Sequence, residues 1–224
     1  MVEEFSLDDG PVEAPPGVMD GKTICEPLTE VPDPARLVFE KWSCCFAQEV
    51  RQLVLDGAPP GNIFGADLSS DLMDMGHKLF LDEDKLGVRF IQSDILDKQS
   101  TLRVEFKGLY DVIHASNFFH VWPWAKTIQV AKDALDLLSD KPGSVILGTQ
   151  VGTRRAKNVN FPHINRSAFF HTTETWKRLW GVAANETGSR LDVQVTEDYF
   201  PDQDIHGWPE ELEFIRLRFI IRRT

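Results

Sequence analysis

The sequence predicts one large α/β domain built on a mostly parallel seven-stranded sheet with helices on both faces. From residue 36 onward, short apolar segments typical of strands alternate with helical patterns of roughly 10–15 residues. The last two strand segments have no helix between them, which predicts an antiparallel hairpin at one edge of the sheet. A dinucleotide-binding domain does not end in this way, so the sequence favours a different α/β architecture.

The first half of this region supplies three strands and two helices. Apolar side chains recur at helical spacing from Phe46 to Val54, and a Gly/Pro-rich run ends that helix. Ser69 is a candidate N-cap for the next helix, whose apolar face we expect to contain Leu72, Met75 and Leu79. In chain order the predicted segments are strand 37–42, helix 46–56, strand 63–67, a helix from residue 69, and strand 88–91.

The second half supplies four strands and two helices. Pro123 is expected at the first position of a helix, because its missing N–H costs nothing there. A helix over 172–186 places two tryptophans, Trp176 and Trp180, on one face with Leu179 and Ala183. In chain order the predicted segments are strand 109–114, a helix from residue 123, strand 144–149, helix 172–186, and strands 191–196 and 214–221.

Charge is concentrated at the amino terminus. Residues 1–35 hold nine acidic residues and one basic residue, within a formal net charge of −11, and also six of the 13 prolines. We therefore predict an acidic, Pro-rich arm over 1–35 and an α/β domain over 36–224. The arm is either disordered or docked on the domain through its few apolar residues.

Composition excludes several classes of protein. The acidic balance argues against nucleic acid or an anionic membrane as the main partner, since both require clustered Lys and Arg. Three cysteines, two of them adjacent, provide no disulfide framework, and no Cys/His spacing suggests a metal site. No leader-like or membrane-spanning apolar run is present, so we expect a cytoplasmic protein with a small-molecule substrate.

Histidines and aromatic residues cluster where the fourth and fifth strands are expected to end, the edge at which open α/β sheets bind ligands. His120 is the first candidate for acid/base chemistry and His114 the second, because imidazole titrates near neutral pH. Each could instead be a structural, hydrogen-bonded residue. The predicted substrate-binding residues are Asn117, Trp122, Trp124, Gln150, His163 and His171, with aromatic walls suited to a flat or polycyclic substrate.

Several motifs together resemble the fungal class I S-adenosylmethionine-dependent methyltransferases of polyketide and meroterpenoid biosynthesis. They are the segment CCFAQEVRQLVLDGAP at 44–59, FGADL at 64–68, MGHKLF at 75–80, DVIHAS at 111–116, FFH at 118–120 and GTQVG at 148–152. The resemblance covers roughly residues 37–222. It implies the Rossmann-like fold of that class and S-adenosylmethionine as cofactor.

The resemblance also implies cofactor-binding positions. Asp67, at the end of the second strand, can accept hydrogen bonds from ribose hydroxyls, although it could equally cap the next helix. Asp94 would meet the adenine amino group, unless it only forms a turn. Leu68, Ile95 and the turn residues Ser43 and Ala47 complete the expected set.

The first turn departs from the family pattern of acid-x-Gly-Cys-Cys-x-Gly-Gln. Ser43 and Ala47 replace both glycines, and Lys41 stands at the acidic position. Glycine allows positive φ and close approach of the backbone to the cofactor. Ser or Ala fits such a turn if φ stays negative, so we expect weakened rather than abolished binding. No metal is expected.

Three functions follow from these observations. The first is methyl transfer from S-adenosylmethionine to an oxygen of a polyketide or terpenoid intermediate. The second keeps the scaffold but catalyses isomerisation or cyclisation, including pericyclic reaction, of such an intermediate without the cofactor, through His acid/base or hydrogen-bond catalysis. The third is a non-catalytic partner subunit. A homodimer is compatible with each of these functions.

Overall fold

The computed structural model describes residues 37–40, 44–161, 165–199 and 213–224. Contacts divide the chain into two units, Met1–Asp33 and Pro34–Thr224, and the description below concerns the second. The predicted arm and two predicted site residues, Ser43 and His163, lie outside the described residues.

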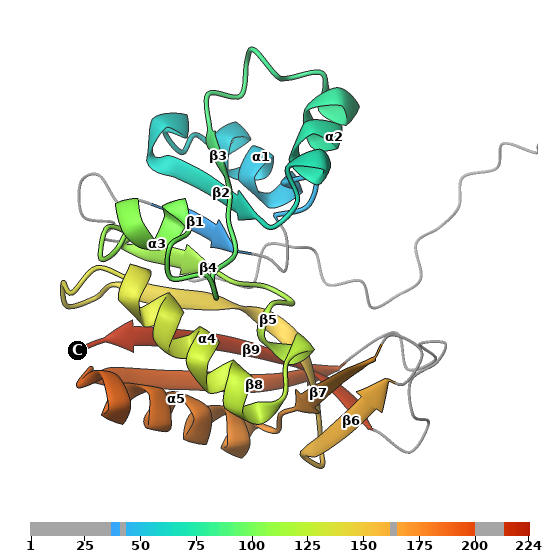
Figure 1. Cartoon of the computed structure of the whole chain (residues 1–224), viewed down its shortest axis with the longest axis vertical. Helices are drawn as coiled ribbons and strands as arrows, with labels where there is room; N and C mark the ends of the chain where they lie inside the picture. Colours follow the sequence, from blue (N-terminus) through green and yellow to red (C-terminus); the bar gives the residue numbers. More distant parts are fainter. Residues whose placement is uncertain (1–36, 41–43, 162–164, 200–212) are drawn as a thin grey trace, which may run out of the picture. The chain divides into compact units, whose positions relative to one another are not determined.

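Seven strands form one sheet in the order β3-β2-β1-β4-β5-β9-β8 (Figure 1). The first five are mutually parallel, and β9 is antiparallel to both β5 and β8. The predicted terminal hairpin is therefore present, with its second strand inserted between β5 and β8 and its first strand at the edge. The strands are β1 Leu37–Glu40, β2 Ile63–Asp67, β3 Arg89–Gln92, β4 Val112–His114, β5 Val145–Thr153, β8 Leu191–Tyr199 and β9 Phe214–Arg223.

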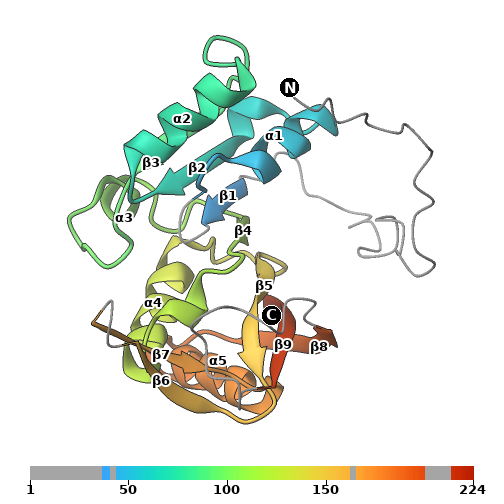
Figure 2. The same ribbon diagram turned by 90° about the vertical axis from the view of Figure 1, so that its right-hand side faces the viewer.

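Helices cover both faces of this sheet because alternate side chains of each strand point to opposite sides. In β2, Ile63 packs with Val50 of α1 and Met73 of α2, whereas Phe64 and Ala66 pack in the larger cluster with α3, α4 and α5. Figure 2 shows α1 and α2 beside β1–β3, and α4 and α5 beside β5, β8 and β9. The helices are α1 Gln48–Leu55, α2 Ser70–Phe80, α3 Thr101–Glu105, α4 Trp124–Leu137 and α5 Thr173–Thr187, with 3-10 turns η1 Pro60–Asn62 and η2 Phe119–Val121.

Helix α5 buries one face, formed by Trp176, Leu179, Trp180 and Ala183. Thr172 caps its amino end by accepting the Thr175 backbone N–H, while the Thr175 hydroxyl accepts the Thr172 N–H. Trp176 and Trp180 are fully buried, in edge-on contact with Phe119 of η2. The predicted tryptophan face is thus confirmed.

The structure corrects the predicted face of α2. Met73 and Gly76 point inward, whereas Met75 and Leu79 are 50% and 62% exposed. Gly76 is required because a Cβ there would lie 2.8 Å from the Phe46 carbonyl oxygen. The spacing of apolar residues alone predicted the wrong buried face for α2, because the helix approaches the turn after β1 most closely at a glycine.

A second sheet was not anticipated from the sequence. The segment after β5 forms an antiparallel pair, β6 Lys157–Phe161 with β7 Arg166–Phe170, where a long loop was expected. Only Val159 of β6 is buried, so the segment lacks the alternating apolar pattern of a core strand. Phe170 of β7 packs with Phe214 at the start of β9, which fixes this hairpin against the carboxyl end of β5.

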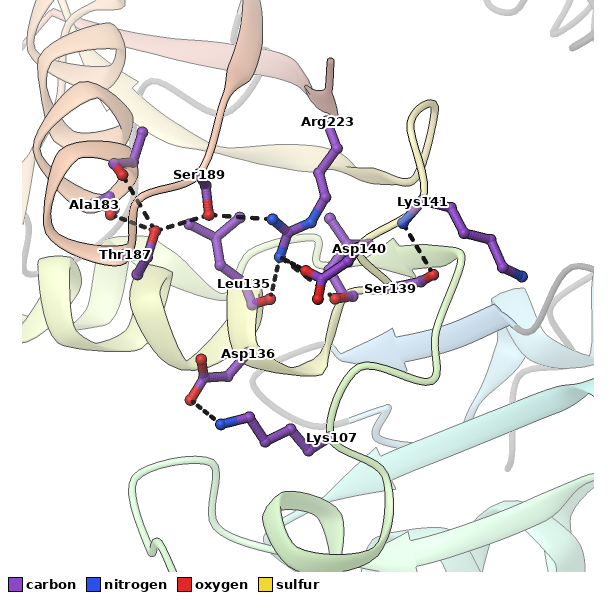
Figure 3. Close-up of polar contacts among 12 residues, drawn as sticks. Lys107, Leu135, Asp136, Ser139, Asp140, Lys141, Ala183, Thr187, Ser189 and Arg223 are labelled. Carbon is purple, nitrogen blue, oxygen red and sulfur yellow. Dashed lines mark hydrogen bonds and ion pairs between the residues drawn. The ribbon is translucent and has the colours of Figure 1, made fainter.

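A polar cluster surrounds Arg223, the last residue of β9, at the end of the sheet where β5 begins (Figure 3). Its guanidinium donates to the Leu135 carbonyl oxygen at 2.8 Å and to the Ser189 hydroxyl at 3.1 Å, and it pairs with Asp140 at 3.3 Å. The Thr187 hydroxyl in turn donates to Ser189 at 2.8 Å. These contacts tie β9 to the carboxyl ends of α4 and α5.

Candidate functional site

The candidate site lies at the carboxyl ends of β1, β2 and β4, which are neighbours in the sheet. Glu40 of β1 pairs with Ala66 of β2, and Phe39 pairs with His114 of β4. The turn after β1 therefore starts between Asp67, the last residue of β2, and His114. Parallel pairing brings these three chain segments to one edge, as predicted.

Asp67 joins that turn to helix α2. Its side chain is 3% exposed; one oxygen accepts the Cys45 N–H at 2.9 Å and the other accepts the Ser69 N–H at 2.8 Å. Carboxylates that accept backbone N–H groups form strong, charge-assisted hydrogen bonds. Asp67 thus closes the turn and holds Ser69, the N-cap residue of α2; this bond is to the cap residue itself rather than to an N–H of the helix, so it is not the solvated helix cap weighed from the sequence. Leu68 beside it is 61% exposed.

The turn itself is left-handed at two residues that carry a Cβ. Cys45 has φ 48° and Ala47 has φ 53°. The condition under which Ala was expected to fit this turn, a negative φ, is therefore not met at Ala47: the backbone retains the conformation that glycine favours. Each such residue costs about 1–2 kcal/mol relative to the right-handed region. Ala47 is buried, with Cys44 and Val50 as neighbours in its cluster, and this packing offsets part of the cost.

Asp94 and Ile95 follow β3, one strand further out. Asp94 is exposed, and its Oδ1 accepts the Leu96 N–H at 2.9 Å in a local turn. The Ile95 side chain is buried in the main core. The turn given as the alternative role of Asp94 is present, and the carboxylate is exposed to solvent.

His114 and Ser116 form a polar pair at the end of β4. The Ser116 hydroxyl lies 3.0 Å from His114 Nε2 and accepts the Thr149 N–H at 3.1 Å. Asn117 is exposed with φ 52°, and its N–H donates to the Thr149 carbonyl oxygen at 2.6 Å. This loop is thereby fixed to β5. Sequence reasoning missed Ser116, although its place two residues after a candidate histidine was available as a signal.

His120 lies on η2, beyond Asn117, and is half-buried against Phe170. Burial lowers its pKa to about 4, so the imidazole is neutral at physiological pH. A group with that pKa is a weak base, since general bases work best near the operating pH. The low pKa therefore disfavours the acid/base role expected of His120 and favours a neutral hydrogen-bonding group.

The aromatic residues divide into two groups. Trp122 is half-buried and packs edge-on against Phe118, with ring centroids 4.9 Å apart. Trp124 and Phe169 surround His171, at centroid distances of 5.5 and 4.8 Å.

Gln150 and His171 are buried rather than exposed at the rim. Gln150 is 1% exposed and His171 is fully buried. Neither side chain has a hydrogen-bond partner among the described residues. The structure therefore does not bring these two side chains to the surface with His114 and Asn117.

Burial lowers the pKa of His171 to about 3, against 6.5 for the ordinary side chain. Only the unfolded chain binds the proton between these values, so His171 reduces stability as pH falls, by about 1.4 kcal/mol per pH unit. We expect the Tm of His171→Phe to fall less than that of the wild type when the pH is lowered from about 7.5 to about 4.5 in thermal melts. An unchanged pH slope would contradict this environment for His171.

Comparison with curated proteins identifies fungal relatives. The chain is 37% identical over 167 residues to Methyltransferase trt5 of Aspergillus terreus, covering 74% of this chain and 59% of that protein. It is 36% identical over 154 residues to O-methyltransferase phiE of a fungal species, covering 69% and 51%. With the Asnovolin E/Chermesin D methyltransferase nvfJ of Aspergillus novofumigatus, it shares 36% identity, covering 76% and 62%.

The chain thus spans about half to three fifths of the length of these relatives. No protein-family profile matches the sequence. The predicted resemblance to fungal methyltransferases of secondary metabolism is confirmed by the curated relatives.

Solved structures share the fold at low identity. A putative S-adenosylmethionine-dependent methyltransferase from Listeria monocytogenes aligns with a TM-score of 0.56 at 14% identity, covering 87% of this chain and 94% of that chain. The Burkholderia thailandensis 1,6-didemethyltoxoflavin-N1-methyltransferase, solved with S-adenosylhomocysteine, gives 0.59 at 11%, covering 85% and 72%. The [4+2]-cyclase SpnF gives 0.58 at 14%, covering 86% and 76%. The Rossmann-like methyltransferase fold is therefore established.

Two features are absent from the described part of the chain. No helix there is long and apolar enough to cross a membrane. No three His, Cys, Asp or Glu side chains among these residues are grouped as metal ligands.

Proposed function

We propose that this homologue of fungal methyltransferases transfers a methyl group from S-adenosylmethionine to an oxygen of a polyketide or terpenoid intermediate. The observation that carries the proposal is the buried Asp67 carboxylate, bound to the turn after β1 at the carboxyl edge of the sheet. The relatives' names as methyltransferases and the fold support the same conclusion. The acceptor is a small molecule, and we place the enzyme in the cytoplasm with a homodimer as its candidate assembly.

The residues at this edge fit the cofactor. Each oxygen of a carboxylate can accept more than one hydrogen bond, so the backbone contacts of Asp67 are compatible with ribose hydroxyls. The exposed Asp94 carboxylate suits an adenine amino group, and the Ile95 backbone and exposed Leu68 would border the base. When bound, S-adenosylmethionine supplies an electrophilic methyl group.

The chain's own contribution is to position the acceptor and manage its proton. Alignment of acceptor oxygen and methyl group supplies most of the rate in such a displacement. His114, with its Nε2 beside the Ser116 hydroxyl, is placed to receive the proton of an acceptor hydroxyl. Neutral His120 would hold that hydroxyl through a hydrogen bond, whereas a carboxylate acceptor would need no base. Asn117, Trp122 and Trp124, with the buried His171 and Gln150 behind them, would shape the substrate pocket.

A second function is favoured by one observation, the Cβ of Ala47 in a left-handed turn where the family carries glycine. If that turn rejects the cofactor, the scaffold is left for isomerisation or cyclisation with His114 and His120 as hydrogen-bonding groups. SpnF shows that this fold also occurs in a [4+2]-cyclase, which is a likeness of fold alone.

The test is mass spectrometry of phenolic and carboxylic polyketide or terpenoid acceptors incubated with the protein and S-adenosylmethionine carrying a trideuterated methyl group. Methyl transfer predicts an acceptor product with the deuterated methyl and equimolar S-adenosylhomocysteine. His114→Gln should lower kcat for hydroxyl acceptors about 100-fold and change carboxylate acceptors little, because only hydroxyl acceptors need a base. Conversion of an acceptor without label would instead support the isomerase alternative, and no conversion of any acceptor would favour a non-catalytic partner.

A further inference from the structure

A buried arginine contacts the strained turn after β1. Arg51, in α1, is 7% exposed, and its Nη1 donates to the carbonyl oxygens of both Phe46 and Ala47, at 3.3 Å for Ala47. These two carbonyl groups lie on either side of the Ala47 N–Cα bond. Phe46, which carries the first of them, directly follows Cys45, the other left-handed residue. Arg51 therefore binds the turn on both sides of Ala47, one of its two left-handed residues.

Arg51 is itself held rigidly. Its Nε and Nη2 donate to the two oxygens of Asp82, at 2.6 and 2.9 Å, and its guanidinium stacks 4.6 Å from the Phe80 ring centroid. The Asp82 carboxylate also contacts Nδ1 of His77 at 2.9 Å. The Arg51 hydrogen bonds lower the pKa of Asp82, so this carboxylate stays ionised at neutral pH. A planar guanidinium presents a fixed fork of donors, which Lys does not reproduce.

We infer that Arg51 is a positioning residue that holds the Cys45–Ala47 turn in the left-handed conformation needed for the cofactor. Its hydrogen bonds compensate for the loss of glycine, which would adopt this conformation without strain. The left-handed conformation at Ala47 is unfavourable for a residue with a Cβ and persists only where the surroundings fix it. Arg51 binds the carbonyls on both sides of that residue, from an anchor on a different segment, Asp82. The link to the cofactor rests on the proposed function; the link between Arg51 and Ala47 does not.

A double-mutant cycle tests this inference. Arg51→Met keeps the buried stem and removes the donors, and Ala47→Gly removes the backbone penalty. Calorimetric titration with S-adenosylhomocysteine should show Arg51→Met weakening binding about tenfold when Ala47 is present, but about threefold or less when it is combined with Ala47→Gly. Arg51→Lys should recover only part of the affinity. In thermal melts, Ala47→Gly should likewise reduce the fall in Tm caused by Arg51→Met.

Arg103→Met is the matched control. Arg103 is 10% exposed and pairs with Asp133 and Asp136, remote in the chain from the turn. It should lower Tm additively with Ala47→Gly, without the coupling expected of Arg51. Additive effects of Arg51→Met and Ala47→Gly on Tm would overturn the inference. If the wild type does not bind the ligand, the proposed function fails, and the melting cycle still decides the role of Arg51.

Discussion

Replacing Asp67 with Ala is expected to weaken S-adenosylhomocysteine binding at least about 100-fold and to lower the free energy of unfolding by about 3 kcal/mol. The variant loses the carboxylate proposed to bind ribose and also orphans the N–H groups of Cys45 and Ser69, which it accepts at 2.9 and 2.8 Å. Calorimetric titration measures the first effect and chemical denaturation the second. The two effects share one cause, the removal of an acceptor from a buried junction.

Two further variants separate binding from folding. Asp67→Asn keeps the shape but turns a donor toward one backbone N–H, so it should weaken binding with a smaller loss of stability. Asp111→Asn is the matched control, because Asp111 precedes β4, at the end of the strand away from the candidate site, where it pairs with Lys141 at 3.2 Å. The affinity of this variant for S-adenosylhomocysteine should stay within about twofold of wild type, as expected for a partly exposed pair. Wild-type affinity in a folded Asp67→Ala protein would contradict the proposed cofactor site.

Gly148→Ala is expected to destabilise the protein by about 3 kcal/mol or more and to abolish methyl transfer. A Cβ at this position in β5 would lie 2.5 Å from the carbonyl oxygen of Ala115 and 2.7 Å from its carbonyl carbon. Backbone atoms cannot rotate away, so the loop that carries His114 and Ser116 would have to shift. Chemical denaturation and the labelled-methyl assay measure the two losses.

Gly181→Ala supplies the control for that substitution. Gly181 lies within α5, and a Cβ added there would have nothing within 4 Å, so Ala should fit and raise stability by about 0.5–1 kcal/mol through helix propensity. Activity should be unchanged. Equal effects of the two substitutions would show that the approach of β5 to Ala115 is not what requires glycine.

The succession of strands and helices along the chain was largely predictable because apolar periodicity is local, whereas the order of the strands across the sheet was not predicted and the short helix α3 was missed. Helix α5 was predicted to within one residue at each end, since a tryptophan stripe marks its face; the Thr172 cap that begins it was not predicted. The β6–β7 hairpin was missed because β6 places one residue, Val159, in a core, so no alternation marks it. Its stability comes from packing between Phe170 and Phe214, residues far apart in the chain.

The candidate site was predictable in position more than in detail. Asp67 and His114 were predicted at the ends of two strands, and the structure brings both strand ends to one edge of the sheet. The burial of His171 was not predictable, because it depends on packing between Trp124 and Phe169. Arg51 escaped notice for the same reason: its partner Asp82 is 31 residues away, and only the fold brings them together.

The central claim is that the left-handed turn at Ala47 still admits the cofactor, and titration of the wild-type chain with S-adenosylhomocysteine tests it most directly. We expect saturable binding at micromolar concentration, corresponding to about −8 kcal/mol, that strengthens in Ala47→Gly because the turn then carries no Cβ. Absence of binding at millimolar ligand in both proteins, with native melting curves, would contradict the claim and leave the cofactor-free reaction as the account of this fold.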